Sequence, residues 1–174
     1  MKYVLLVSLS LLALSAQMTL RLPLFLQPCF PLLLALTWGL AFSPGHAIAA
    51  GAINGLLVDV ASAAPLGSHL LATLLPTLLT IPGIGGFLEK RLAEALVLVP
   101  IATVIYYVSL ALAFAATGRI VDWSGDVIWI WIPGIVANVV WSFPMLWITG
   151  LLAERTTRFP SGGIALRPFT HDRS

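Results

Sequence analysis

The stretch from Gly51 to Gly67 reads GAINGLLVDVASAAPLG, and it joins a helix that carries small residues to the turn that ends it. Ala47, Gly51, Gly55 and Asp59 recur at intervals of four residues, so they share one face of the predicted helix. Small side chains at this spacing allow another helix to approach closely. We call these four residues the small-residue stripe, and we expect it to contact protein rather than lipid.

The end of the stripe places an acid on an otherwise apolar helix. An aspartate in the middle of a bilayer costs about 3 kcal/mol on insertion scales, and each Leu or Ile returns about 0.5 kcal/mol. The aliphatic residues between positions 48 and 60 roughly cancel the cost of Asp59, but Asn54 and the glycines leave the segment marginal in lipid. Two roles for Asp59 stay open, namely capping the following turn and contacting a partner directly.

The turn after this helix contains Pro65, Leu66 and Gly67, and His69 opens the next apolar segment. Because a short turn joins the two helices, a side-chain pair between Asp59 and His69 is geometrically possible. The stripe, the turn and His69 together form the candidate site, which serves either helix packing or partner binding.

The rest of the chain is strongly apolar. Only 9% of its 174 residues are charged and 59% are hydrophobic, whereas a soluble domain carries about a quarter charged residues. A helix of about 20 apolar residues crosses the roughly 30 Å hydrocarbon core of a bilayer. We therefore predict an all-α membrane protein, a bundle of six transmembrane helices over residues 1–153 with a basic cytoplasmic tail over residues 154–174. The predicted spans are 3–20, 29–42, 46–61, 67–86, 92–116 and 127–152, and the connections between them include 88–91 and 117–126.

The basic residues favour an orientation with both chain termini in the cytoplasm. Seven of them then lie inside and two outside, which follows the positive-inside rule. The inside set is Lys2, Lys90, Arg91, Arg155, Arg158, Arg167 and Arg173, and the outside set is Arg21 and Arg119. This distribution suits anionic lipid headgroups rather than nucleic acid. Trp123, Trp129 and Trp131 are then expected at the outer interface, as membrane anchors.

The first span has a second interpretation. Lys2 followed by the apolar run from Val4 to Leu14 resembles the start of a secretory signal, and small residues follow that run. A retained helix is favoured because the chain stays largely apolar beyond Ala16 and because an even number of spans fits the charges better.

The sequence offers little for catalysis. It has no His-Glu-x-x-His motif, and its single cysteine, Cys29, excludes an intrachain disulfide and disfavours a cysteine metal site. The acids divide between the two predicted membrane faces. Asn138, in the middle of the last span, is expected to bond across helices with a contribution of about 0.6–2 kcal/mol. We therefore expect no enzymatic activity, no cofactor and no metal.

The stretch from Gly55 to His69 resembles the signature of a known protein family. Gly55-Leu-Leu-Val-Asp59, continued by Ser62-Ala-Ala-Pro-Leu-Gly67 and His69, is similar to the signature of MreD, the rod shape-determining membrane proteins. Pro31 at the start of the second span and a Pro133…Asn138…Pro144 pattern in the last span agree with it. The polar residue that many members carry at the start of the second span is absent here, where the chain reads Pro28-Cys-Phe-Pro31.

The resemblance implies a fold similar to the substrate-binding components of energy-coupling-factor transporters. It also implies a role in the bacterial inner membrane, where MreD proteins associate with MreC, and through it with RodA, the elongation transpeptidase and MreB. The resemblance thus predicts a non-enzymatic component of the cell-elongation machinery that docks MreC and helps organise peptidoglycan synthesis. The alternative is a substrate-binding membrane component of a small-molecule, vitamin-type transporter. The polar residues predicted at mid-span are few, and this favours the interaction protein.

Overall fold

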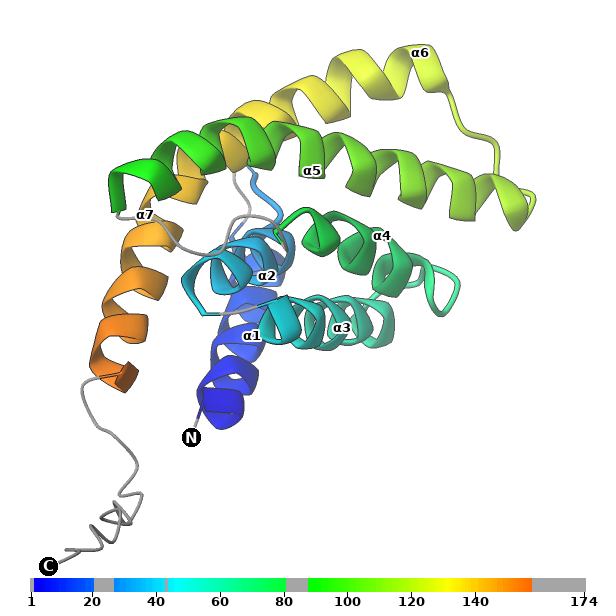
Figure 1. Cartoon of the computed structure of the whole chain (residues 1–174). Coiled ribbons are helices and arrows are strands. Elements are labelled where there is room, and N and C mark those ends of the chain that lie inside the picture. Colours follow the sequence, from blue (N-terminus) through cyan, green and yellow to red (C-terminus); the bar gives the residue numbers. More distant parts are fainter. Residues whose placement is uncertain (1, 21–26, 43, 81–87, 158–174) are drawn as a thin grey trace, which may run out of the picture.

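The computed structural model describes residues 2–20, 27–42, 44–80 and 88–157, and this part of the chain is helical and contains no strand (Figure 1). Its elements are α1 (Lys2–Thr19), α2 (Phe30–Ala41), α3 (Pro44–Ala61), α4 (Ser68–Thr77), a short 3₁₀ turn (Leu78–Thr80), α5 (Leu88–Ala116), α6 (Trp123–Asp126), a π-helical turn (Val127–Trp131) and α7 (Ile132–Thr157). Since the last three are continuous, the described residues form six helical rods, as the sequence predicts for the helix count.

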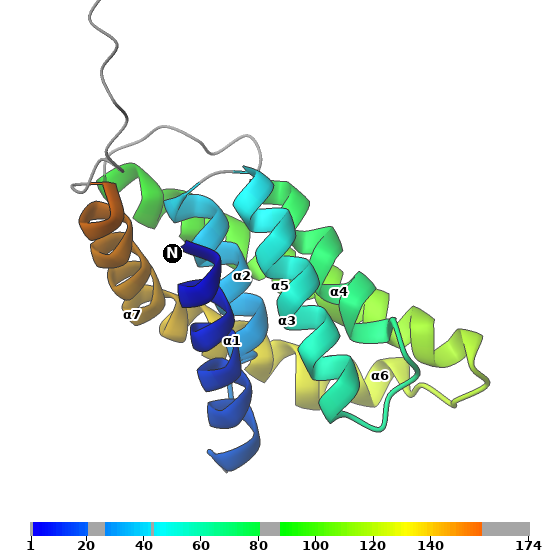
Figure 2. The same ribbon diagram turned by 90° about the horizontal axis from the view of Figure 1, so that it is seen from below.

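The 12-residue helix α2 lies at the centre of the molecule. Every residue from Phe30 to Leu40 is buried, and α2 contacts α1, α3, α4, α5 and α7. Figure 2 shows these neighbours grouped around it. A helix that is apolar on all sides is stable only when other helices cover all of its faces. The uniformly apolar sequence of α2 therefore explains its central position. From the sequence we expected α3, rather than α2, to be surrounded by protein.

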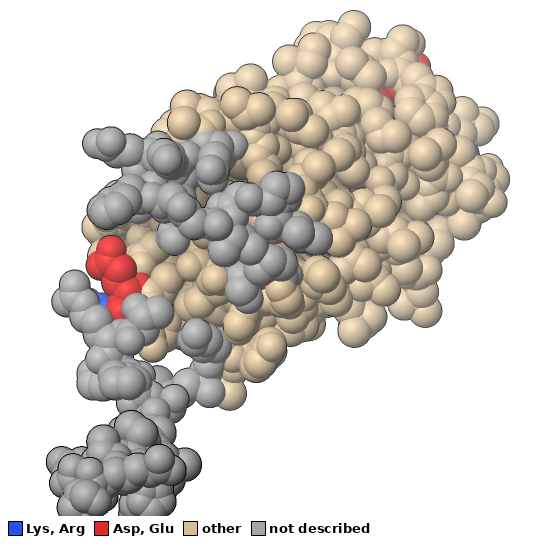
Figure 3. Space-filling model, in the orientation of Figure 1, with Lys and Arg blue, Asp and Glu red and all other residues tan. Residues whose placement is uncertain are grey.

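The outer surface of the bundle is also largely apolar. Figure 3 shows a broad uncharged face, and the charged groups of the described residues that are visible on it lie near its two ends. Large side chains are exposed on several helices, among them Leu12, Val60, Val97, Trp129 and Trp147. Two stretches, Ala95–Ala116 and Trp123–Thr156, are long and apolar enough to cross a bilayer, and the apolar helices before them are shorter.

Several predicted boundaries need correction. Residues 88–91, predicted as a connection, form the first turn of α5, because Leu, Glu, Lys and Arg are all good helix formers. The connection predicted over 117–126 is shorter, because the Asp122 side chain accepts a bond from the Gly125 N–H and starts α6 at Trp123. The predicted tail is also partly helical: α7 extends to Thr157, and residues 158–174 lie outside the described residues, as do 81–86 of the fourth predicted span.

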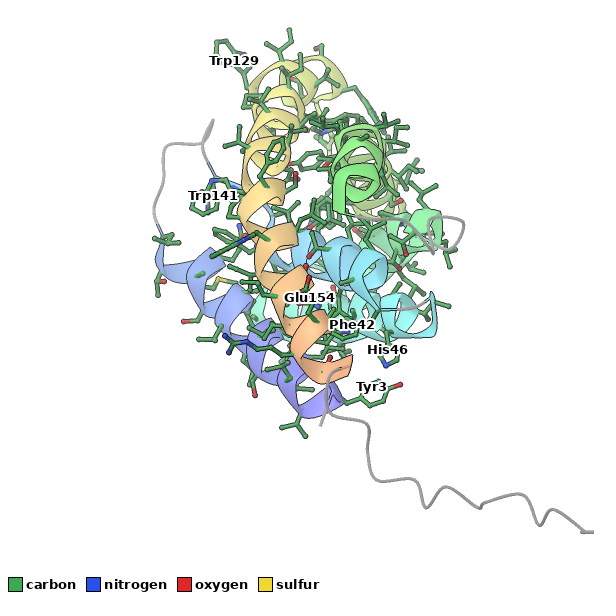
Figure 4. The ribbon with its side chains drawn as sticks, turned by 60° about the vertical axis from the view of Figure 1, so that its left-hand side comes forward. Tyr3, Phe42, His46, Trp129, Trp141 and Glu154 are labelled. Atoms are coloured by element: carbon green, nitrogen blue, oxygen red, sulfur yellow. The ribbon has the colours of Figure 1, made fainter. Side chains whose placement is uncertain are left out.

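One end of the bundle is defined by a group of aromatic rings. Tyr3 of α1 stacks on His46 of α3 with ring centroids 5.4 Å apart, and Phe42, just after α2, lies 6.0 Å from His46. Figure 4 shows these three side chains near Glu154 of α7. The start of α1, the end of α2, the start of α3 and the end of α7 therefore meet at one end, while Trp129 lies at the other.

Candidate functional site

The small-residue stripe of α3 packs against α4 inside the same chain. A Cβ atom built on Gly55 would lie 2.6 Å from the Leu70 Cα, and one built on Gly51 would lie 2.8 Å from the Thr77 Oγ1. Ala47, at the start of the stripe, is fully buried. The prediction that the stripe contacts protein is confirmed. Within the chain these residues serve helix packing, and α4 covers the surface around Gly51 and Gly55.

Asp59 caps the first turn of α4 from the preceding helix. Its Oδ2 accepts bonds from the N–H groups of Gly67 (2.9 Å) and Leu70 (3.0 Å), and its Oδ1 accepts one from the His69 N–H (2.8 Å). The aspartate is only 2% exposed. An anion at a helix N-terminus satisfies N–H groups that have no partner within the helix and interacts favourably with the helix dipole. The predicted capping role of Asp59 is therefore confirmed.

Gly67 explains why α4 is capped by Asp59, which lies eight residues earlier in the chain. It occupies the N-cap position with a φ of 91°, a left-handed conformation that favours glycine, and it has no side chain to cap the helix itself. Asp59 supplies the missing acceptors. In the same turn Ser68 donates its N–H to the Pro65 carbonyl (3.1 Å), and Leu66 is exposed. Aspartate, glycine and the turn between them thus form one structural unit, which we call the α3–α4 joint.

The His69 side chain turns away from Asp59. Its Nδ1 lies 3.0 Å from the Tyr106 hydroxyl of α5, and Asp59 bonds only to the His69 main chain. The side-chain pair that the short turn makes possible is therefore replaced by a contact between α4 and α5. Burial of Tyr106 provides the reason, because a buried phenol hydroxyl needs a polar partner and His69 is within reach.

A second remote cap lies at the start of α2. The Cys29 N–H donates to the Asn138 Oδ1 of α7 (2.7 Å), and the Phe30 N–H donates to the Gln17 Oε1 of α1 (3.0 Å). The Asn138 amide also donates to the Thr103 Oγ1 of α5 (3.1 Å). Asn138 is fully buried. Its predicted role in bonding across helices is confirmed, and the structure adds that it caps the central helix.

A row of aromatic rings extends from the α3–α4 joint to α6, and it was not predicted from the sequence. Tyr106 meets Tyr107 edge to face at 5.5 Å, Tyr107 stacks on Trp131 at 5.9 Å, and Trp131 meets Trp123 at 6.0 Å. The sequence feature that could have predicted this row is the pair of adjacent tyrosines, Tyr106 and Tyr107, within a long apolar helix. Trp131, predicted as a membrane anchor, also packs α5 against the π-helical turn.

Two hollows among the described residues are small and mainly apolar. One of about 260 Å³ lies between α1, α2 and α7, lined by Leu9, Leu12, Ala13, Ala16, Phe30, Leu34, Trp141, Pro144, Met145, Ile148 and Thr149. The Thr149 hydroxyl in this lining bonds to carbonyls of its own helix. A smaller hollow of about 170 Å³ lies between α5 and the π-helical turn. The described residues contain no group of three or more His, Cys, Asp or Glu arranged to hold a metal.

The polar groups described above bond mainly to one another and to helix ends, so this arrangement positions the helices relative to one another. Scans against protein families, curated proteins and solved structures each found no match to this chain. The resemblance to MreD proteins thus rests on the residues quoted above.

Proposed function

We propose that this chain is a multi-pass protein of the bacterial cytoplasmic membrane, with six membrane helices and both termini in the cytoplasm. The apolar exterior is the main support for membrane insertion. Soluble proteins rarely expose contiguous apolar patches of more than a few hundred Å², and here exposed Leu, Val, Ile and Trp side chains occur on several helices. Charged groups near the ends of the bundle fit the two lipid–water interfaces (Figure 3).

Within that membrane, the proposed role is a non-enzymatic component of the cell-elongation machinery that docks MreC. The observation that carries this proposal is that the residues similar to the MreD signature make one joint. Gly55 allows α4 to approach, Asp59 caps α4, and Gly67 provides the turn. A signature whose members act together in this way is better explained by a shared fold than by chance similarity of apolar sequence.

The proposed docking surface for MreC lies outside the stripe, since α4 covers the stripe. A bitopic partner contributes one membrane helix, which can pack only against a helix face that the bundle leaves exposed. Exposed positions on different faces can be tested one at a time with a photo-crosslinking amino acid. Suitable positions are Leu12 on α1, Val60 on α3, Val97 on α5 and Trp147 on α7.

The test is copurification from native membranes with mass identification of bound proteins and small molecules. Recovery of MreC, with crosslinks from one group of exposed positions and none from a crosslinker at the buried Ala50, would support the proposal. Recovery of a stoichiometric small molecule without MreC would instead support the vitamin-type transporter component. Recovery of neither, from membranes that contain MreC, would contradict the proposed docking.

A further inference from the structure

Three buried polar atoms have no hydrogen-bond partner among the described residues. They are the Oγ of Ser10 on α1, the Nε1 of Trp38 on α2 and the Oδ1 of Asn54 on α3. The residues that carry them are 0%, 0% and 1% exposed, respectively. Unpaired polar atoms at such burial are rare in folded proteins, because each loses its bonds to water on folding. Three of them on three helices that touch one another require a common explanation.

Ser10 and Asn54 lie at one level of the bundle. The stacked rings of Tyr3 and His46 place those two residues side by side, and α1 and α3 both run away from that end (Figure 2). Ser10 follows Tyr3 by seven residues and Asn54 follows His46 by eight. At 1.5 Å per residue these positions are about 10 Å and about 12 Å from the ring pair.

Trp38 reaches the same level from the opposite direction. Its backbone lies four residues before Phe42, hence about 6 Å further from that end by helix rise, and its ring packs on the Phe42 ring with centroids 4.4 Å apart. Side chains on a helix lean towards its N-terminus, and the N-terminus of α2 points away from this end. This lean favours an indole position closer to Ser10 and Asn54 than the Trp38 backbone is, and the side chain belongs to the same buried cluster as Leu6, Ala13 and Ala50.

The three residues also face the same interior. Leu6 and Ala13 of α1, Trp38 of α2 and Ala50 of α3 belong to one buried cluster. Ser10 lies between Leu6 and Ala13 on the face that those two residues share. Asn54 is one turn beyond Ala50, and its amide nitrogen donates to the Ala50 carbonyl (2.9 Å), which leaves only its oxygen unpaired.

We propose that Ser10, Trp38 and Asn54 hold one buried water molecule between α1, α2 and α3. The chemistry of the three groups is complementary to water, since the indole N–H donates, the amide oxygen accepts and the hydroxyl does either. A buried water typically makes about three hydrogen bonds to otherwise unpaired groups. Leu6, Trp38 and Ala50, which lie in the same cluster, are fully buried. This inference is independent of the proposed docking of MreC.

The direct test is NMR of the full chain in detergent micelles with ¹⁵N-labelled tryptophan. The Trp38 indole signal is assigned by its loss in Trp38→Phe, and a cross-relaxation peak between that N–H and water is sought. The proposal expects a peak from a long-lived water that is weakened at least about twofold in Ser10→Ala and in Asn54→Leu, because each removes one of the about three bonds that hold it. In the matched control Ser142→Ala the peak should be unchanged, because the buried Ser142 hydroxyl is already bonded to the Val139 carbonyl.

An assigned Trp38 signal without a water peak would overturn the proposal, because the indole would then bond directly to protein or remain unpaired. So would a peak that neither substitution weakens. The direction of the change in Tm on thermal unfolding is an independent test of whether a water molecule links the three groups. If water links the groups, Ser10→Ala and Asn54→Leu each lower the Tm by a few degrees. If the groups are unpaired, both substitutions remove a buried polar atom without a partner and raise the Tm, which would also overturn the proposal.

Discussion

Two aspartates cap helices in this molecule, and they do so in opposite settings. Asp59 is buried, belongs to the preceding helix and binds three N–H groups around the first turn of α4. Asp122 is exposed, is the N-cap residue of α6 itself, and binds the Gly125 N–H (3.2 Å) and the Ser124 hydroxyl (2.9 Å). The same carboxylate chemistry therefore fixes two packed helices relative to each other in one place and only starts a short helix in the other.

The difference shows where the stability of this fold is concentrated. A charge-assisted hydrogen bond in a buried setting is strong, and loss of the acceptor leaves buried donors without partners. At a wet surface, water replaces a lost acceptor. The α3–α4 joint should therefore control the folding of the bundle, while the α5–α6 connection should tolerate change.

Removing the buried cap, Asp59, should lower the unfolding free energy more than any other substitution considered below. Asp59→Ala leaves three N–H groups, those of Gly67, His69 and Leu70, without their acceptor. We expect a loss of about 3 kcal/mol or more of unfolding free energy. The measurement is equilibrium unfolding in detergent, with Asp122→Ala as the matched control. Equal effects of the two substitutions would remove the distinction between a buried and an exposed cap.

The close approach of α4 to the stripe can be tested with a single methyl group. Gly55→Ala would place its Cβ 2.6 Å from the Leu70 Cα, a main-chain atom that moves only if α4 shifts. Overpacking of this kind costs about 1–3 kcal/mol. Gly45→Ala, near the start of the same helix, is the control, since the methyl group added there would have no neighbouring side chain or helix within 4 Å. Unchanged stability of Gly55→Ala would mean that the two helices are not held at this distance.

The second remote cap should rank below Asp59, because its acceptor is neutral. Asn138→Leu removes the acceptor of the Cys29 N–H and the donor to the Thr103 hydroxyl. We expect a loss of about 1–2 kcal/mol, in line with interhelical amide bonds in membrane proteins. Thr156→Val is a suitable control, because the Thr156 hydroxyl bonds within α7. A loss larger than that of Asp59→Ala would contradict the ranking by charge.

Residue patterns within a single segment predicted the features that depend on that segment alone, such as where a helix ends and which of its faces contacts protein. The end of α5 at Ala116 was predicted from the residues that follow it, and Gly118 there adopts a φ of 78° and closes the helix. The spacing of Gly51, Gly55 and Asp59 likewise predicted a face that contacts protein. Which helix covers that face depends on the path of the chain, and no pattern in α3 contains that information.

Side-chain partners between distant helices were not predictable for the same reason. Asn138 was identified as a bonding residue, but its partner at Cys29 is 109 residues away. For His69, the sequence indicated the nearby Asp59 as a possible side-chain partner, and the folded chain brings its ring to Tyr106 of α5 instead. The burial of α2, by contrast, was available from its uniformly apolar sequence.

The exposed cap should have the smallest effect and a distinct pH dependence. The Gly125 N–H and the Ser124 hydroxyl bond to the ionised carboxylate and hold the pKa of Asp122 below its usual value. A depressed folded-state pKa stabilises α6 fully above the unfolded pKa of about 3.9, and the contribution is lost as the pH falls through the folded value. Amide-exchange protection of residues 125 and 126 should thus be constant from neutral pH to about pH 5 and decrease below about pH 4, with no such step in Asp122→Asn. A step that persists in Asp122→Asn would contradict the assignment of this pH dependence to Asp122.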